Sequence, residues 1–223
     1  NAVSRETRLN QEVGREAIHS ELRVDELRRT ADFRLIETGA TSKESHLSSP
    51  NRGAQLSETS AAELSPEGHT VQILVSDGLS AEAVHHNIPD LLPVLLEGLA
   101  AREITVGRPL LAQYGRVKLA ERIAEKLDTQ VIVHLIGERP GGDAQASRSL
   151  SAYLLYRLTD PDAQQAAAKF NGNPDIACEY TVISNIYSGG LPPTEAAGVI
   201  LERVCAILEH RAAGNRLESL VKA

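Results

Sequence analysis

The chain has 223 residues and a formal net charge of −7, an acidic balance that argues against partners with a phosphate backbone and against anionic membrane surfaces. Aromatic residues make up only 3% of the chain and Trp is absent, so single-stranded nucleic acid would find few stacking partners. No apolar stretch is long enough to span a bilayer, and we therefore expect a globular protein with neither a nucleic-acid partner nor a membrane anchor.

Residues 1–66 differ in composition from the rest of the chain. A charged, helix-prone segment at 4–29 carries a weak apolar stripe, and residues 38–66 are rich in Ser, Thr and Gly around a short helix expected at 57–64. We expect these 66 residues to form a helical and loop arm on a main domain spanning 67–223. The chain contains no Met, so we also expect residue 1 to lie downstream of the translational start.

After residue 66, short apolar runs alternate with helix-like segments. Strands are predicted at 71–76, 109–114 and 130–136, and further candidates begin at Tyr153 and Thr181. The helices expected between and after them are a turn capped by Ser80, an apolar helix capped by Asp90, helix 117–127, a short helix or loop at 163–169, and helix 194–213. This alternation predicts an α/β fold with an open, doubly wound, mostly parallel, Rossmann-like sheet.

Four polar motifs stand where apolar runs stop. They are Ser76-Asp77-Gly78, Tyr114-Gly-Arg-Val117, Gly137-Glu-Arg-Pro140 and Ser184-Asn185. Ligands of such sheets bind outside the carboxyl ends of the strands, so these turns are predicted to line one site. Their carboxylate, guanidinium, amide and hydroxyl groups suit a large polar neutral ligand more than a phosphate. For Glu138 and Arg139, a salt bridge between neighbouring loops is about as probable as contact with a ligand.

Other kinds of site have little support in the sequence. No Gly-x-Gly-x-x-Gly or Walker-type loop follows a strand, and Leu74 stands where a nucleophile elbow needs its first Gly. The adjacent His85 and His86 point in different directions on a helix, so we give them surface or capping roles. Two cysteines without metal-ligand spacing favour reduced thiols and a cytoplasmic protein. We therefore predict neither a catalytic residue nor a metal site in this chain.

A series of motifs carries a resemblance to a known family. In order along the chain they are Val75-Ser-Asp-Gly-Leu-Ser80, Gly107-x-Pro109, Tyr114-Gly-Arg-Val-Lys118, Ile136-Gly-Glu-Arg-Pro-Gly141, Ser149-Leu-Ser151 followed by Tyr153, Ile183-Ser-Asn-Ile186, and Gly190-x-Pro-Pro193 with Glu195-Ala-Ala197. Over about residues 70–214 the sequence resembles the small subunit of bacterial ethanolamine ammonia-lyase, the adenosylcobalamin-dependent lyase that converts ethanolamine to acetaldehyde and ammonia.

The resemblance implies a non-catalytic, cofactor-binding subunit that closes over the cobalamin at an interface with the catalytic large subunit of a hetero-oligomer. Carried over by motif, the cobalamin contacts are Val117, Glu138 and Val182, with Arg116 as a further candidate. Position 182 is often Cys in the family, so only a main-chain or packing contact can survive there. The family also suggests association with a bacterial microcompartment inside the cytoplasm.

The coordination of cobalt can be predicted independently of the contact residues. Cobalamin proteins that supply a His ligand use Asp-x-His-x-x-Gly, and none of the nine Asp residues has a His two positions on. Any cobalamin bound here is therefore expected to be base-on, with its own dimethylbenzimidazole on cobalt, which agrees with what the resemblance implies. The alternative function is a stand-alone nucleotide-binding module or hydrolase that uses Ser76, Asp77 and Glu138.

Overall fold

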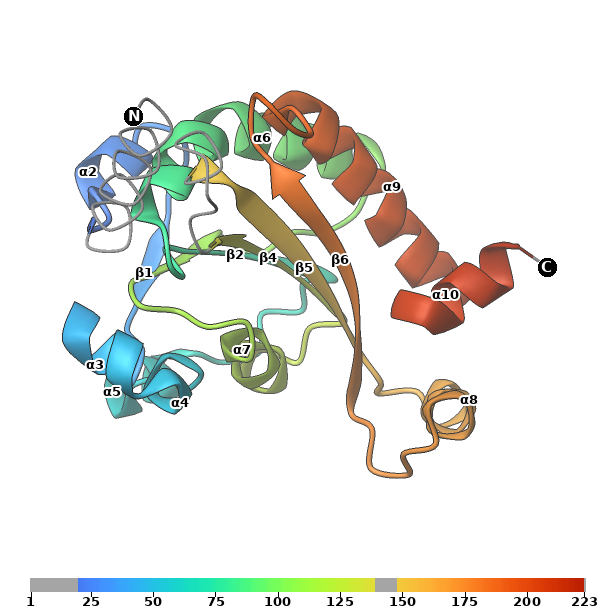
Figure 1. Cartoon of the computed structure of the whole chain (residues 1–223). Coiled ribbons are helices and arrows are strands. Elements are labelled where there is room, and N and C mark those ends of the chain that lie inside the picture. Colours follow the sequence, from blue (N-terminus) through green and yellow to red (C-terminus); the bar gives the residue numbers. More distant parts are fainter. Residues whose placement is uncertain (1–19, 139–147, 223) are drawn as a thin grey trace, which may run out of the picture.

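A computed structural model of the chain describes residues 20–138 and 148–222, so Arg139 and most of the helical segment predicted at 4–29 lie outside the described residues. The described part is a mixed α/β structure built on one six-stranded sheet, in the order β1-β3-β2-β4-β5-β6 (Figure 1). The strands are β1 (Arg34–Ile36), β2 (Val71–Ser76), β3 (Leu110–Ala112), β4 (Val131–Gly137), β5 (Leu150–Arg157) and β6 (Cys178–Ile186).

The sheet has a parallel half and an antiparallel half. Strands β1, β3, β2 and β4 pair in parallel, whereas β5 is antiparallel to both β4 and β6. The α/β class is confirmed, but the mostly parallel, Rossmann-like doubly wound sheet is not. Parallel neighbours need a crossover connection, usually a helix, and the segment between β4 and β5 has no helical pattern. The prediction was wrong because it extended the strand–helix alternation of the first strands to β5 and β6.

Helices lie on both sides of the sheet. Helices α6 (Ala81–Ala101) and α9 (Pro193–His210) cover one face, and α7 (Leu119–Leu127) covers part of the other (Figure 1). The remaining helices are α2 (Val24–Leu27), α3 (Lys43–Ser48), α4 (Pro50–Gly53), α5 (Glu58–Glu63), α8 (Pro161–Asn171) in the β5–β6 connection, and α10 (Gly214–Val221) after α9. Within the described residues, no helix is long and apolar enough to cross a membrane.

Each face of the sheet has its own hydrophobic core. Successive side chains of a strand point to opposite faces of the sheet. Val75 therefore packs in the core under α6 and α9, whereas its neighbour Leu74 packs in the core under α7. Ile123 and Leu127 of α7 belong to the second core, as the predicted apolar stripe of helix 117–127 requires.

Helix α6 differs from the prediction. Ser80 caps it as expected, since its side chain accepts a hydrogen bond from the Ala83 amide at 3.1 Å, but the helix then runs without a break to Ala101. Asp90 is therefore not a cap, and Pro89 and Pro93 both lie inside the helix. The prolines remove backbone donors, and the burial of the apolar side chains of the helix offsets that cost. These are Val84, Ile88, Leu91, Leu92, Leu95 and Leu99.

The strand ends carrying the four motifs lie along one edge of the sheet. Ser76 pairs with Ala112 on one side and Ile136 on the other, and Leu150 pairs with both Gly137 and Ile186. Because β6 is antiparallel to β5 and β5 is antiparallel to β4, β6 runs in the same direction as β4. The predicted common edge is therefore present, although part of the sheet is antiparallel. We call it the carboxyl edge.

The arm contributes directly to the sheet and its cores. Strand β1 pairs with β3, and Leu27, Phe33 and Ile36 are buried in the two cores. Helix α5 confirms the short helix expected at 57–64. The division of the chain at residue 66 stays a prediction.

Candidate functional site

Asp77 directly follows strand β2 and is fully buried at the carboxyl edge. The Tyr114 amide donates to Asp77 Oδ1 at 2.6 Å, and Lys43 Nζ of α3 lies 3.5 Å from Asp77 Oδ2. Burial raises the pKa of Asp77 to about 6, although the Lys43 charge and the Tyr114 hydrogen bond oppose that rise. Asp77 therefore links a residue of the arm to the turn after β3, with no exposed surface of its own.

His46 of α3 contacts both the turn after β2 and the turn after β3. Its Nδ1 lies 2.8 Å from the Tyr114 carbonyl oxygen and its Nε2 lies 2.8 Å from that of Gly78. Burial and the nearby Arg116 charge lower the pKa of His46 to about 4, while the two carbonyl oxygens oppose this. A neutral ring donates from only one nitrogen, so both contacts are hydrogen bonds only when the ring is protonated.

The turn after β3 is held against the arm at further points. Arg116 Nη2 donates to the His46 carbonyl oxygen at 2.9 Å, and the Arg116 amide donates to the Gly53 carbonyl oxygen at 2.9 Å. A Cβ at Gly53 would lie 2.3 Å from the Tyr114 carbonyl oxygen, so the arm approaches this turn closely only because position 53 has no side chain. The guanidinium of Arg116 thus bonds within the protein, and its role as a ligand contact stays a prediction.

Ser76 and His134 form a buried pair on the α7 face of the sheet. Ser76 Oγ lies 2.8 Å from His134 Nε2, and both side chains have no solvent exposure. Burial lowers the pKa of His134 to about 3, so the ring is neutral near pH 7. Gly115 covers the hydroxyl, because a Cβ there would lie 2.7 Å from Ser76 Oγ. A substrate cannot reach this serine in the described structure.

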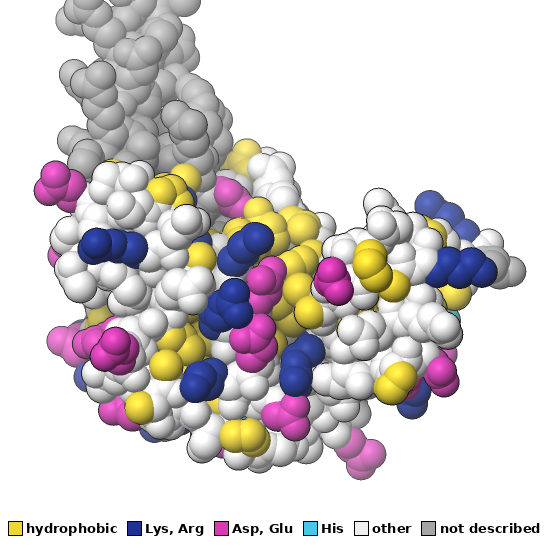
Figure 2. Space-filling view, turned by 90° about the horizontal axis from the view of Figure 1, so that it is seen from below, with side chains coloured by type: hydrophobic (Ala, Val, Ile, Leu, Met, Phe, Trp, Pro, Cys, Tyr) yellow, Lys and Arg dark blue, Asp and Glu magenta, His cyan; other side chains and the backbone are white. Residues whose placement is uncertain are grey.

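A different surface lies at the end of β4 and on the neighbouring strands β5 and β6. Tyr153 Oη donates a hydrogen bond to Glu138 Oε1 at 3.2 Å. Val182 of β6 lies directly opposite Tyr153 in the β5–β6 pairing. Val182 is 46% exposed, and Glu138 and Tyr153 are partly exposed. We call these three residues the Glu138 surface. Figure 2 looks at this side of the molecule, where hydrophobic side chains gather in a hollow bordered by charged ones.

Val117 lies near His134, the residue opposite Tyr153 on β4. It is partly exposed just before α7, and its backbone approaches His134 closely enough to offset part of the burial effect on that ring's pKa. His134 is the registered partner of Tyr153 on β4. The structure therefore brings the predicted contacts Val117, Glu138 and Val182 to one side of the sheet, whereas the side chain of Arg116 points to the arm.

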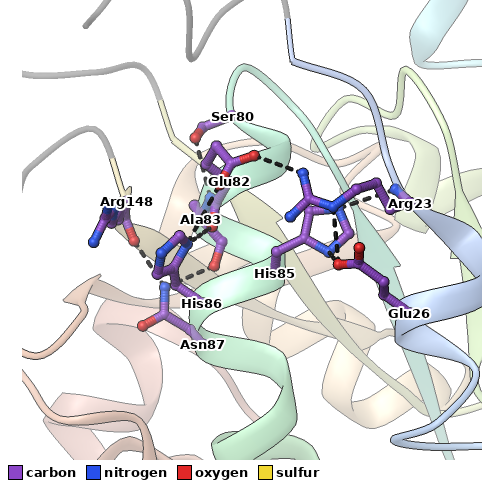
Figure 3. Close-up of polar contacts among 9 residues, drawn as sticks. All are labelled: Arg23, Glu26, Ser80, Glu82, Ala83, His85, His86, Asn87 and Arg148. Atoms are coloured by element: carbon purple, nitrogen blue, oxygen red, sulfur yellow. Dashed lines mark hydrogen bonds and ion pairs between the residues drawn. The ribbon is translucent and has the colours of Figure 1, made fainter.

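The two adjacent histidines of α6 have structural contacts (Figure 3). His85 Nε2 accepts a hydrogen bond from the Arg23 amide at 3.0 Å, and His86 Nδ1 lies 2.8 Å from the Glu82 carbonyl oxygen. Arg23 also pairs with Glu82 at 2.8 Å, which ties the arm to the start of α6. His86 is exposed, as expected for a surface role, whereas the His85 side chain is only 5% exposed and packs against the arm, so a surface role is wrong for His85.

The Glu138 surface offers a carboxylate, a phenol and an aliphatic side chain. The described residues contain no group of three His, Cys, Asp or Glu side chains arranged to hold a metal. Glu138 can accept hydrogen bonds from the amides at a corrin edge, and Val182 offers an apolar side chain beside exposed strand backbone.

Several residues of this region were missed by sequence reasoning. Lys43 and His46 lie in a segment that read as Ser- and Thr-rich loop, and no pattern in it indicates burial. His134 did carry a signal, since a single polar residue inside the apolar run Val131–Gly137 must find a buried partner.

One family model matches nearly the whole chain. The model described as "Ethanolamine ammonia-lyase light chain (EutC)" matches residues 2–218 of the chain. The match extends through the arm, upstream of the motifs that first suggested the resemblance. A light chain of this enzyme is one subunit of a hetero-oligomeric lyase that also contains a large subunit. The chain belongs to the ethanolamine ammonia-lyase light chain family.

Proposed function

We propose that this chain is the small, non-catalytic subunit of an adenosylcobalamin-dependent ethanolamine ammonia-lyase. In this proposal the carboxyl edge and the Glu138 surface form part of the cobalamin site, at the interface with the large subunit. Val117, Glu138 and Val182 contact the cofactor, and Arg116 is a further candidate. The adenosyl cofactor supplies the radical chemistry, and the residues of this chain bind it, orient it and exclude water.

The observation that carries the proposal is the grouping of Glu138, Val182 and Val117 on one exposed side of the sheet. The three positions are far apart in the sequence, yet the pairing of β4, β5 and β6 and the turn before α7 place them on the same side of the sheet. Val182 lacks the thiol that is common at the family position, so its contact with the cofactor is through packing or the main chain. The absence of an Asp-x-His pair favours a base-on cofactor.

The alternative, a stand-alone nucleotide-binding module or hydrolase, finds less support. It needs Ser76 and Asp77 at a surface that a substrate can reach, and both side chains are fully buried. Asp77 is engaged by Tyr114 and Lys43, while Ser76 is engaged by His134. Glu138 alone of the three is exposed to solvent.

Reconstitution with the large subunit tests the proposal. We expect the assembled complex to bind adenosylcobalamin, measured by corrinoid absorbance after desalting, and to release acetaldehyde from ethanolamine. The isolated small subunit should show no turnover. Turnover by the isolated chain, or a complex that is active without corrinoid, would contradict the proposal.

Glu138→Ala is the first site variant to measure in the complex. It removes a carboxylate acceptor for corrin amides, so we expect roughly tenfold weaker cobalamin binding, about 1.4 kcal/mol. Glu97→Ala is the matched control, because Glu97 is an exposed carboxylate on α6, across the sheet from the Glu138 side chain. Equal cobalamin affinity in the two variants would remove Glu138 from the site.

The place of the holoenzyme in the cell is a further part of the proposal. We propose a cytoplasmic enzyme associated with a bacterial microcompartment, as the family suggests. Fractionation of cells, with the large subunit and a shell protein as markers, distinguishes a microcompartment enzyme from one that is free in the cytoplasm.

A further inference from the structure

Tyr153 belongs to a sequence motif that the proposed contacts leave unused. It follows Ser149-Leu-Ser151 and lies in the middle of β5, between β4 and β6. Its registered neighbours are His134 on β4 and Val182 on β6. Paired residues of antiparallel strands project to the same face, so the ring of Tyr153 lies between these two side chains.

The phenol of Tyr153 is also hydrogen-bonded to Glu138. Its hydroxyl donates to Glu138 Oε1 at 3.2 Å. Burial and the nearby Glu138 carboxylate raise the pKa of Tyr153, so the proton stays on the phenol and Glu138 remains the acceptor. Among the described residues, no side chain other than Tyr153 donates a hydrogen bond to Glu138.

Two of the three predicted cofactor contacts thus adjoin the Tyr153 ring. Glu138 is hydrogen-bonded to its hydroxyl, and Val182 lies opposite it on β6. The backbone of the third, Val117, lies near His134, the neighbour of Tyr153 on β4. The ring is partly exposed and forms part of the face that α7 leaves uncovered. It offers an aromatic surface at the centre of a site whose other groups are a carboxylate and an aliphatic side chain.

We propose that Tyr153 is a further cofactor-binding residue and that it positions Glu138. Its hydroxyl fixes Glu138 Oε1, which leaves Oε2 to accept a hydrogen bond from a corrin amide. Its ring packs against the apolar edge of the macrocycle between Glu138 and Val182. This inference rests on the proposed function, because it assigns Tyr153 to the same cobalamin site.

The test measures the affinity of adenosylcobalamin for the assembled complex of both subunits, by equilibrium dialysis. The variants are Tyr153→Phe, which removes only the hydroxyl, Tyr153→Ala, which also removes the ring, and Glu138→Ala alone and combined with Tyr153→Phe. Tyr156→Phe is the matched control. Tyr156 lies on the same strand but is buried in the core under α9.

We expect Tyr153→Phe to weaken cobalamin binding about fivefold, Tyr153→Ala at least about tenfold, and Tyr156→Phe to leave it unchanged. In the Glu138→Ala background the additional effect of Tyr153→Phe should fall below about twofold, since the carboxylate that it positions is gone. Hydroxocobalamin, which lacks the adenosyl group, should show the same ranking.

The outcomes separate this inference from the proposed function. A wild-type complex that binds cobalamin while both Tyr153 variants bind it equally well overturns the role of Tyr153 and leaves the proposed function intact. An undiminished effect of Tyr153→Phe in the Glu138→Ala background overturns the positioning role. A wild-type complex that binds no corrinoid overturns both. If Tyr153→Ala does not assemble, Tyr153→Phe decides the result.

Discussion

The two halves of the sheet use similar polar motifs in opposite ways. At the carboxyl edge of the parallel half, Ser76 and Asp77 are fully buried, and Lys43 and His46 of the arm close over the turns beside them. Farther along the sheet, Val182 of β6 is 46% exposed, and Glu138 after β4 and Tyr153 of β5 are partly exposed. The buried turns after β2 and β3 therefore form a structural frame, and exposed side chains lie at the end of β4 and on β5 and β6.

This contrast shows that a charged residue at the end of a strand is not by itself a binding residue. Asp77 and Glu138 both follow parallel strands at the same edge, yet Asp77 is engaged by Tyr114 and Lys43. Exposure and remaining hydrogen-bonding capacity distinguish the two. Variants of the buried edge should change folding, whereas variants of the Glu138 surface should change binding.

The largest expected effect is on folding, in Asp77→Ala. The change leaves the Tyr114 amide without its acceptor and the Lys43 ammonium without its ion-pair partner in a buried place. We expect the free energy of unfolding to fall by about 3 kcal/mol. Denaturant unfolding of the small subunit measures this, and Asp175→Ala is the control because Asp175 is exposed. Equal stabilities would contradict the structural role assigned to Asp77.

A smaller effect should appear in the pH dependence of stability. Burial holds the folded pKa of His134 at about 3, below the usual 6.5. As the pH falls through 6.5 the unfolded chain takes up the proton first, so the stability contributed by the neutral ring is lost progressively between about pH 6.5 and pH 3. The slope from this one group is at most about 1.4 kcal/mol per pH unit.

His134→Gln removes this titration and should flatten the curve of unfolding free energy against pH. Asp77 acts in the opposite direction. Its folded pKa is raised to about 6, so its contribution to the unfolding free energy falls as the pH rises from about 4 to 6. Asp77 is present in both proteins, so their difference reports His134. Parallel curves for the wild type and the variant between pH 5 and 7 would show that His134 does not titrate as described.

The smallest expected effect is that of Val182→Ser. Its side chain is largely exposed, so the unfolding free energy should change by less than about 0.5 kcal/mol. Cobalamin binding by the complex should weaken about threefold, because an apolar contact is lost. The fully buried Val133→Ser on β4 is the contrasting variant and should cost about 2 kcal/mol of stability. If Val182→Ser lowered the unfolding free energy as much as Val133→Ser does, the distinction between the buried carboxyl edge and the exposed Glu138 surface would be contradicted.

Much of the core of the fold could be predicted from the sequence. The apolar runs around Val75 and Val133 are buried strands, and the motifs that end them do meet at one edge. The direction of β5 could not be read from its sequence, because an apolar strand buried on both faces looks the same in parallel and antiparallel pairing. The continuous helix α6 was missed because Pro89 and Pro93 normally end a helix, whereas here burial of its apolar side chains keeps it intact.

The candidate site was predictable only in part. The family motifs predict Val117, Glu138 and Val182 as cofactor contacts, and the structure brings these positions to one side of the sheet. The roles of Lys43 and His46 could not be predicted, since long-range contacts with Asp77 and Gly78 bury them rather than any local pattern. Tyr153 was part of a motif, but its bond to Glu138 depends on the register of β4 and β5.

The most direct test of the central claim is an experimental structure of the assembled large and small subunits with adenosylcobalamin bound. The account predicts a corrin ring whose edge contacts Glu138 and Val182 across the subunit interface, with Val117 beside it and dimethylbenzimidazole on the cobalt. A corrin bound entirely within the large subunit, with the Glu138 surface left in solvent, would contradict it.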